Sequence, residues 1–200
     1  MILNKEQKAI LIGVILGDAY LQRTGERNAR LRLEHSIKQK DYLLWKVNKF
    51  PQLFQGQPKY IQRQHPISGG IYQYCRHQSN ATPELGKWRL RFYQDNKKKI
   101  PKNLKDYLKD PLSLAVWYMD DGYYYNRDKV SYLYLGRVTK MDAETAKDAI
   151  QNNFGILSKV LDKKKKGFAL YFFPRETQKL HELLKKYIIP SLNYKINITP

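Results

Sequence analysis

The sequence has little cysteine, few acidic residues and no long apolar run. Cys75 is the only cysteine among 200 residues, which excludes an intrachain disulfide and a metal site built from cysteine ligands. The longest apolar run near the N-terminus, residues 9–16, is far shorter than the roughly 20 residues that a membrane-spanning helix needs. The opening residues MILNKEQK lack the charged and apolar zones of a signal peptide. These absences predict a soluble, intracellular protein and do not separate an organelle (mitochondrion or chloroplast) from a prokaryotic cytoplasm.

Basic residues outnumber acidic ones by more than two to one. Lys and Arg number 37 and Asp and Glu number 18, which gives a formal net charge of +19. A surface of this charge attracts phosphate groups over a long range, so nucleic acid is the first candidate partner. An anionic membrane surface is the second, and a basic protein without such a partner is the third. Hydrophobic residues at 42% and aromatic residues at 13% indicate a folded domain and not a disordered basic tail.

The chain divides into two similar halves, each beginning with an apolar helix that leads to an aspartate. The helix at 4–17 has Asn4 as its N-cap, and the helix at 111–120 has Pro111 at its first position. Behind each helix, stretches with alternating apolar residues, which predict strands, and stretches with helical spacing of apolar residues follow in the same order in both halves. In the first half we expect a strand at 29–35, a helix at 38–50, strands at 59–65 and 70–78, and a helix at 83–93. In the second half we expect a strand at 130–138, a helix at 142–154, strands at 157–162 and 168–173, and a helix at 175–187.

This order predicts an α+β fold of two pseudo-symmetric αββαββα halves, residues 1–104 and 105–200. The strands carry alternating Arg, Lys, Gln and Tyr on one face, which suits a groove of nucleic acid. A solvated sheet face is the alternative, and the net charge favours the DNA-facing interpretation. The residues expected to contact DNA are Arg30, Arg32, Arg63, Tyr72, Arg76, Arg137, Lys140, Lys163 and Lys164.

Asp18 and Asp121 stand in matching places after the two apolar helices. A carboxylate is unfavourable there, because burial penalises its charge and the helix dipole is negative at that end. Two such positions indicate a cation at each helix end, although a turn cap or a lysine partner is the structural alternative for each. Oxygen ligands without neighbouring His or Cys favour Mg²⁺, with Ca²⁺ or Mn²⁺ as substitutes. A metal held by paired carboxylates beside DNA phosphates fits hydrolysis of a phosphodiester.

The four histidines, in contrast, show no metal-ligand spacing. We therefore expect them at the surface or facing DNA; they are His35, His65, His77 and His181.

The two helices also carry a family resemblance. LIGVILGDA at residues 11–19 and LAVWYMDDG at residues 114–122 resemble the two motif copies of the single-chain LAGLIDADG homing endonucleases. Both copies keep the acidic eighth position, at Asp18 and Asp121. The resemblance covers essentially the whole chain, so both halves are expected to belong to one such enzyme.

Each copy departs from the family pattern. The first copy has Leu16 where the family name shows Asp, and Ala19 in place of the final glycine. The second copy has Val116 and Asp120 at its third and seventh positions, where small residues are usual.

The resemblance implies how the site is assembled. The motif helices would pair, with Asp18 and Asp121 side by side as metal ligands and the carbonyl groups of Gly17 and Asp120 as further contacts to metal or water. The two sheets, each four-stranded and antiparallel, would form a saddle over double-stranded DNA. Both strands would be cut across the minor groove, leaving short 3′ overhangs, by a monomer that is an internal pseudo-dimer.

The resemblance also implies supporting residues. A lysine near each site activates the attacking water or stabilises the transition state, and the matching positions are Lys98 and Lys195. Glu34 occupies the place of a polar residue that orders solvent near the first metal, and its counterpart in the second half would be Thr139.

Three other functions compete with a DNA endonuclease. A group I intron RNA maturase would bind intron RNA with the same scaffold, and a non-catalytic DNA-binding protein would have no need of the carboxylates. A carbohydrate hydrolase could use paired aspartates but has no need of the positive charge. The presence of Asp18 and Asp121 favours the nuclease without excluding maturase activity.

Overall fold

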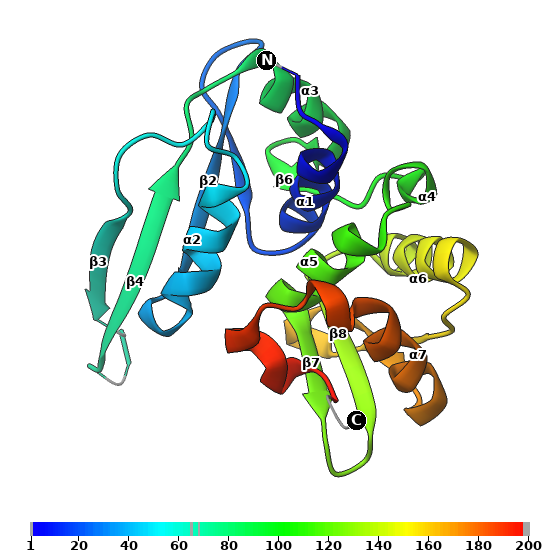
Figure 1. Ribbon diagram of the computed structural model, residues 1–200. Helices are drawn as coiled ribbons and strands as arrows, with labels where there is room; N and C mark the ends of the chain where they lie inside the picture. The colour runs from blue at the N-terminus through cyan, green and yellow to red at the C-terminus, as the bar shows by residue number, and fades with distance from the viewer. Residues whose placement is uncertain (1, 65, 68, 198–200) are drawn as a thin grey trace. The chain divides into compact units, whose positions relative to one another are not determined.

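The computed structural model (Figure 1) describes residues 2–64, 66–67 and 69–197. They form two compact units. Unit 1 contains the described residues of 1–3 and 18–91, and unit 2 contains those of 4–17 and 92–200. The first motif helix therefore belongs to unit 2, while Asp18 belongs to unit 1. Within the part of the chain that the structure describes, no helix is long and apolar enough to cross a membrane.

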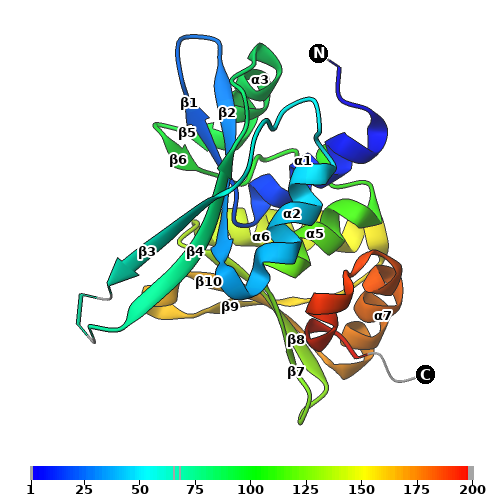
Figure 2. The same cartoon turned by 60° about the vertical axis from the view of Figure 1, so that its left-hand side comes forward.

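Unit 1 is built on a four-stranded antiparallel sheet in the order β1-β2-β4-β3 (Figures 1 and 2). Its strands are β1 (Tyr20–Arg23), β2 (Ala29–Ser36), β3 (Lys59–Gln64) and β4 (Ile71–Gln78). A 3₁₀ turn, η1 (Ile37–Gln39), leads into α2 (Lys40–Asn48), which packs on β2 and β4. Helix α3 (Pro83–Phe92) follows β4. Buried and half-buried side chains alternate along β2, which confirms the predicted two-faced strand.

Unit 2 combines both motif helices with a second four-stranded antiparallel sheet, in the order β7-β8-β10-β9. The motif helices are α1 (Lys5–Leu16) and α5 (Pro111–Asp121), which pack on each other. The strands are β7 (Gly122–Tyr125), β8 (Val130–Gly136), β9 (Lys159–Asp162) and β10 (Phe168–Phe172). Helix α6 (Lys140–Phe154) packs on β9 and β10, and helix α7 (Pro174–Leu184) packs on β8 and β10. The short elements are α4 (Leu104–Tyr107), η2 (Lys164–Lys166), η3 (Lys185–Tyr187) and η4 (Pro190–Lys195).

The starts of the motif helices follow from local sequence, as predicted. The Asn4 side chain accepts a hydrogen bond from the Gln7 amide at 2.8 Å, and the Gln7 side chain accepts one from the Asn4 amide. At α5 the Asp110 side chain accepts from the Leu112 amide at 3.0 Å, and Pro111 occupies the first helical position. Both helices are buried over most of their length.

The predicted fold class is confirmed, with shifts at element ends. The last predicted residue of the strand at 59–65, His65, lies outside the described residues. Helix α6 begins at residue 140 and not at 142, because Thr139 is its N-cap. The Thr139 hydroxyl accepts a hydrogen bond from the Asp142 amide at 3.0 Å, and the Asp142 carboxylate accepts one from the Thr139 amide.

The join between the halves contains a hairpin that the sequence analysis missed. Strands β5 (Tyr93–Gln94) and β6 (Lys97–Lys98) pair antiparallel around Asp95 and Asn96. Both turn residues have positive φ angles, 49° and 61°, as a type I′ hairpin turn requires. Asp and Asn tolerate this conformation, so the Asp-Asn pair was a usable signal. The hairpin matters because it carries Lys98.

Candidate active site and nucleic-acid interface

The motif helices approach each other closely where the first copy has glycine. A side-chain carbon added to Gly13 would lie 2.6 Å from both the Ser113 carbonyl oxygen and Val116 Cβ. A carbon added to Gly17 would overlap the Asp120 carboxylate. Val116 and Asp120 are the two larger residues that depart from the motif in the second copy. The glycines of the first copy therefore make room for the larger side chains of the second.

A lysine from elsewhere in unit 2 contacts the C-terminal end of each motif helix. Lys98 Nζ donates to the Gly17 carbonyl oxygen at 2.5 Å. Lys195 Nζ donates to the carbonyl oxygens of Met119 and Asp120 at 2.6 and 3.0 Å. Neither helix has a basic residue in its own last turn, so these ammonium groups supply the positive charge that offsets the helix dipole. The structure thus brings both predicted lysines to the predicted helix ends.

The two aspartates directly follow carbonyl groups that these lysines contact. Asp121 is the last residue of α5 and is half-buried, and the Asp18 side chain is 46% exposed. The carbonyl oxygens of Gly17 and Asp120, predicted to contact metal or water, each accept a lysine hydrogen bond. A carbonyl oxygen has two lone pairs, so this bond is compatible with a second contact. The pairing of Asp18 with Asp121 stays a prediction.

A buried polar network anchors the chain segment that carries Lys195. Tyr118 Oη donates to the Lys195 carbonyl oxygen at 2.9 Å, and the Asn197 amide donates to His181 Nδ1 at 2.9 Å. Because Nδ1 accepts, His181 Nε2 carries the proton, and it lies 2.9 Å from Ser131 Oγ. Burial lowers the pKa of His181 from 6.5 to about 4, so the ring is neutral at neutral pH.

Asp18 borders an open polar cleft in unit 1. The other lining residues are Tyr20, Arg32, Glu34, His35, Ser36, Gln39 and Tyr74. Oxygen-bearing side chains dominate this set, which suits a hard cation such as Mg²⁺. The residues around Asp18 therefore fit the predicted metal. His35 Nδ1 lies 3.9 Å from Asp18 Oδ2.

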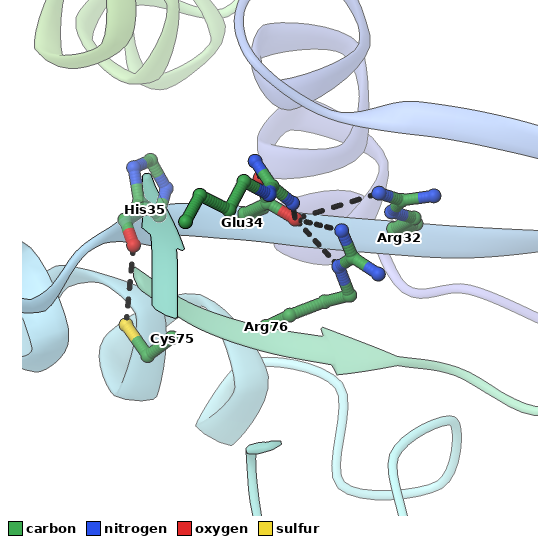
Figure 3. Close-up of polar contacts among 6 residues, drawn as sticks. Arg32, Glu34, His35, Cys75 and Arg76 are labelled. Carbon is green, nitrogen blue, oxygen red and sulfur yellow. Dashed lines mark hydrogen bonds and ion pairs between the residues drawn. The ribbon is translucent and has the colours of Figure 1, made fainter. Parts of the chain in front are cut away.

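Glu34 is held by arginines of three strands of the unit 1 sheet (Figure 3). Arg63 donates to both carboxylate oxygens at 2.7 and 2.9 Å, Arg76 Nε donates at 2.5 Å, and Arg32 lies at 3.4 Å. Burial raises the pKa of Glu34, but the hydrogen bonds from Arg63 and Arg76 outweigh it and lower the pKa to about 2. Glu34 is therefore a carboxylate at neutral pH, and it neutralises part of the arginine charge. Its predicted role in ordering solvent stays a prediction.

The register of the unit 1 sheet places the predicted DNA contacts of the first half on one face. Residues directly opposite each other in neighbouring strands share a face. Glu34 stands opposite Arg76, and Arg63 stands opposite Tyr72. Side chains two residues apart along a strand also share a face. The predicted contacts on this face are Arg30, Arg32, Arg63, Tyr72 and Arg76, and we call it the arginine face.

The unit 2 sheet presents tyrosines on the corresponding face. Tyr123 stands opposite Tyr132, and Tyr132 stands opposite Tyr171, so the rings form a row across β7, β8 and β10. The Tyr132 and Tyr171 ring centres are 5.2 Å apart, and Lys163 Nζ lies 4.6 Å from the Tyr132 ring centre. These residues are exposed or half-buried. The members of this tyrosine face are Tyr123, Tyr125, Tyr132, Tyr134 and Tyr171.

The predicted basic contacts of the second half lie in the segments that follow the strands. Arg137 follows β8, and its Nε donates to the Lys165 carbonyl oxygen at 3.3 Å. Lys163 and Lys164 lie in the connection between β9 and β10, and Lys140 is the exposed first residue of α6. Their contacts with DNA stay predictions.

The sheet registers show which residue of the second half corresponds in position to Glu34. In the unit 1 sheet Arg32 pairs with Tyr20, and Glu34 lies two residues after Arg32. In the unit 2 sheet Tyr132 pairs with Tyr123, and Tyr134 lies two residues after Tyr132. Tyr20 and Tyr123 each lie two residues after a motif aspartate. Tyr134 therefore occupies the corresponding place in the unit 2 sheet, whereas Thr139 lies beyond β8 and caps α6. The solvent-ordering role of Thr139 stays a prediction.

The expectation of surface histidines was wrong for three of the four. His35, His77 and His181 are only 5%, 7% and 3% exposed, and His65 lies outside the described residues. His35 follows the buried residues Leu31 and Leu33 at intervals of two, so the strand alternation already contained this signal.

Comparisons with known proteins agree with this geometry. Residues 8–180 match the model of the LAGLIDADG DNA endonuclease family. The chain is 28% identical to the probable intron-encoded endonuclease 1 of Wickerhamomyces canadensis, over 97% of this chain and 85% of that protein. It is 27% identical to protein RecA of Mycolicibacterium flavescens, over 97% of this chain and 47% of that protein. It is 25% identical to cytochrome b mRNA maturase bI2 of Saccharomyces cerevisiae, over 97% of this chain and 48% of that protein. The chain spans about half the length of the first curated relatives it matches.

Solved structures share the fold. The homing endonuclease I-WcaI bound to its DNA recognition sequence matches with a TM-score of 0.90 and 26% identity, over 99% of this chain and 89% of that chain. The N-terminal LAGLIDADG domain of DUF199/WhiA matches with a TM-score of 0.52 and 12% identity, over 94% and 87%. The second likeness is one of fold alone.

Proposed function

Because the chain belongs to the LAGLIDADG DNA endonuclease family, we propose that it is a site-specific homing endonuclease acting on double-stranded DNA. It cleaves both strands of one long asymmetric target across the minor groove and leaves short 3′ overhangs. It acts as a monomer whose related halves are residues 1–104 and 105–200, with Mg²⁺ as its metal and Mn²⁺ or Ca²⁺ as substitutes. The observation that carries this proposal is the pair of motif helices, each contacted by a lysine just before an aspartate.

The residues divide the chemical work. Asp18 and Asp121 hold the metal through carboxylate oxygens. When bound, the metal polarises the phosphodiester and lowers the pKa of a coordinated water. Lys98 and Lys195 keep positive charge at the two helix ends, where it stabilises the negative charge that develops on phosphate oxygens during attack. Because a backbone carbonyl fixes each ammonium group, little reorganisation is needed during the reaction.

The two sheets bind DNA by different contacts. The arginine face offers bidentate donors that recognise base edges, above all guanine. The tyrosine face offers aromatic surface together with Lys163 and Lys164, which contact phosphates. A formal net charge of +19 supports a footprint over many phosphates.

The decisive experiment selects cleavable sites from a randomised duplex library with the wild-type chain and with Asp18→Asn and Asp121→Asn. We expect one long asymmetric site from the wild type in Mg²⁺ and no cleavage by either variant, because each loses a charged metal ligand. Gel-shift binding of the selected site without metal is expected to persist in both variants. A variant that cuts at the wild-type rate would remove that aspartate from the catalytic site, and a wild type that selects no site would refute the endonuclease.

RNA maturase activity is the second candidate, because the chain resembles a cytochrome b mRNA maturase over 97% of its length. The test adds the protein to a self-splicing group I intron that contains or adjoins the selected DNA site. Faster splicing that persists in Asp18→Asn would establish maturase activity independent of cleavage. No change in the splicing rate would restrict the chain to DNA. A purely DNA-binding role is disfavoured, because it requires neither carboxylate.

A further inference from the structure

Beneath the cleft that contains Asp18, unit 1 buries a lysine beside a histidine. Lys46, on α2, is fully buried, and its Nζ lies 3.0 Å from His35 Nε2. The same Nζ lies 4.1 Å from the centre of the Tyr42 ring. A ring face attracts a cation, and the imidazole offers a lone pair, so both neighbours can interact with the lysine ammonium group.

The lysine determines which ring nitrogen of His35 carries the proton. An ammonium group has three donors and no acceptor, so the Lys46–His35 contact requires His35 Nε2 to accept. In a neutral imidazole the other nitrogen then carries the hydrogen. Nδ1 is therefore an N–H group, which can donate to a carboxylate but cannot bind a metal.

This N–H group faces the motif aspartate. His35 Nδ1 lies 3.9 Å from Asp18 Oδ2, and the histidine side chain is 3% exposed while the aspartate is 46% exposed. The distance is longer than a direct hydrogen bond, so the interaction in this structure is an electrostatic attraction between the N–H group and the carboxylate. The histidine is the fixed partner. Its ring packs 5.1 Å from the Tyr42 ring, and its carbonyl oxygen accepts the Cys75 thiol contact at 3.6 Å (Figure 3).

We propose that Lys46 and His35 form a positioning pair that orients the Asp18 carboxylate for metal binding, with Lys46 setting the His35 tautomer and His35 Nδ1–H holding the carboxylate. The inference rests on the proposed nuclease function, in which Asp18 is a metal ligand. Neither Lys46 nor His35 touches the reacting atoms, so both act through Asp18. Partners of this kind, one step behind a metal ligand, typically change metal affinity or activity 10- to 100-fold when they are removed.

The second half lacks this device. In the unit 1 sheet Arg32 pairs with Tyr20, and His35 lies three positions after Arg32. In the unit 2 sheet Tyr132 pairs with Tyr123, and Leu135 lies three positions after Tyr132. Tyr20 and Tyr123 each lie two positions after a motif aspartate. Leu135 therefore takes the place of His35, and a leucine side chain has no donor. The positioning pair supports Asp18 alone, so its loss is expected to slow the cutting of one DNA strand more than the other.

The first test reads the tautomer directly, by nitrogen NMR of selectively labelled histidine in the metal-free protein. We expect the His35 signals to show Nδ1–H and an unprotonated Nε2, and we expect Lys46→Met to change that pattern. An Nε2–H tautomer in the wild type, or a pattern that Lys46→Met leaves unchanged, would overturn the proposal. This test requires no DNA and no activity, so it is decisive even if the protein is not a nuclease.

The second test compares His35→Phe, His35→Asn and the control His77→Phe. Phenylalanine keeps the ring shape and removes the donor, whereas the asparagine amide restores an N–H near the position of Nδ1. His77 is a second buried histidine of the same sheet, and it does not line the Asp18 cleft. Mn²⁺ binding, followed by electron paramagnetic resonance, is expected to weaken 10- to 100-fold in His35→Phe, to recover in part in His35→Asn, and to be unchanged in His77→Phe. Equal affinities in all four proteins would refute the proposal.

The same variants are then assayed on a supercoiled plasmid carrying the selected site. We expect His35→Phe to accumulate nicked circles, cut mainly in one strand, and excess Mg²⁺ to restore linear product. A general loss of folded protein would lower both cuts equally and would not respond to Mg²⁺. Equal slowing of both strands without metal rescue would therefore contradict the positioning role, whereas a wild type without any cleavage would instead refute the proposed function.

Discussion

The two four-stranded sheets have the same strand order but different surface chemistry. The unit 1 sheet carries the arginine face, in which Glu34 is held by Arg63 and Arg76. The unit 2 sheet carries the tyrosine face, where Tyr132 contacts Tyr171 and Lys163. The motif helices also differ from each other, since the first has glycines where the second has Val and Asp. The two four-stranded sheets thus share a strand order and differ in surface chemistry.

The two sheets therefore share a fold but should contribute differently to the energetics of DNA binding. A charged face attracts DNA over a long range and weakens in salt, while aromatic contacts act only at short range and are insensitive to salt. Changes made at equivalent positions of the two sheets should therefore have unequal effects on DNA binding.

Replacing either of the two lysines is expected to change the cleavage rate more than the other substitutions below. Lys98 is exposed on a short hairpin, whereas Lys195 is 8% exposed and lies in a segment anchored by Tyr118. Lys98→Met and Lys195→Met are each expected to lower the cleavage rate about 100- to 1,000-fold, by loss of one transition-state donor. Only Lys195→Met is expected to lower the Tm, because it leaves the Met119 carbonyl buried without its donor.

The measurements are single-turnover cleavage of the selected site and thermal unfolding. Lys97→Met is the matched control, since residue 97 is the neighbouring exposed lysine of the same strand. Equal loss of Tm in both variants would show that the two lysines are energetically equivalent, and a normal rate in either would remove it from the site.

Acid is expected to weaken the two units in different pH ranges. The pKa of His181 in unit 2 is lowered from 6.5 to about 4 by burial, so the unfolded chain binds a proton that the folded unit resists. Its contribution, about 3 kcal/mol by linkage, is present above pH 6.5 and is lost as the pH falls toward 4. The pKa of Glu34 in unit 1 is lowered from 4.5 to about 2, so its contribution is lost only between pH 4.5 and 2.

Urea unfolding at a series of pH values measures both effects. His181→Phe should flatten the dependence between pH 6.5 and 4, and Glu34→Gln should flatten it between pH 4.5 and 2. If His181→Phe leaves the upper range unchanged, the buried network does not govern the acid response of unit 2.

Several of these features could be predicted from the sequence, and the reason differs from residue to residue. Asn4 and Pro111 predicted the helix starts because capping is local, and the alternation of Leu31 and Leu33 predicted the faces of β2. Lys98 and Lys195 came from resemblance, because the contacts with the helix ends join residues about 80 positions apart. His181 lies with Leu180 and Leu184 on the buried face of α7, so the helical period already contained the signal for its burial. Its contact with Ser131, 50 positions away, could not be predicted, since no local period links the two segments.

The seam between the motif helices is expected to show a compensating pair. Gly17→Ala places a carbon on the Asp120 carboxylate, which should cost about 1–3 kcal/mol of stability, as overpacking does. Asp120→Ala removes that carboxylate, so the double variant should recover most of the loss. Stability is measured by urea unfolding in a double-mutant cycle, where contacting residues typically couple by about 0.5–3 kcal/mol. Gly13→Ala serves as the contrast, because its obstacle includes the Ser113 backbone and Asp120→Ala should not rescue it. Additive effects of Gly17→Ala and Asp120→Ala would mean that the seam adjusts elsewhere.

Single substitutions on the arginine face and the tyrosine face are expected to have small effects on DNA binding. Arg30→Gln removes one charge from the arginine face, and Tyr123→Ala removes one ring from the tyrosine face. Both should weaken binding of the selected DNA, but only Arg30→Gln should reduce the slope of log affinity against log salt, by about one unit if Arg30 contacts a phosphate. If Arg30 instead recognises a base edge, its loss relaxes sequence preference at one position while the slope changes little. Gel-shift titrations at several salt concentrations, repeated with single-base variants of the site, distinguish these outcomes. A lower slope for Tyr123→Ala would show that the tyrosine face also orders phosphate contacts. It would contradict the expectation that the two faces bind DNA by different contacts.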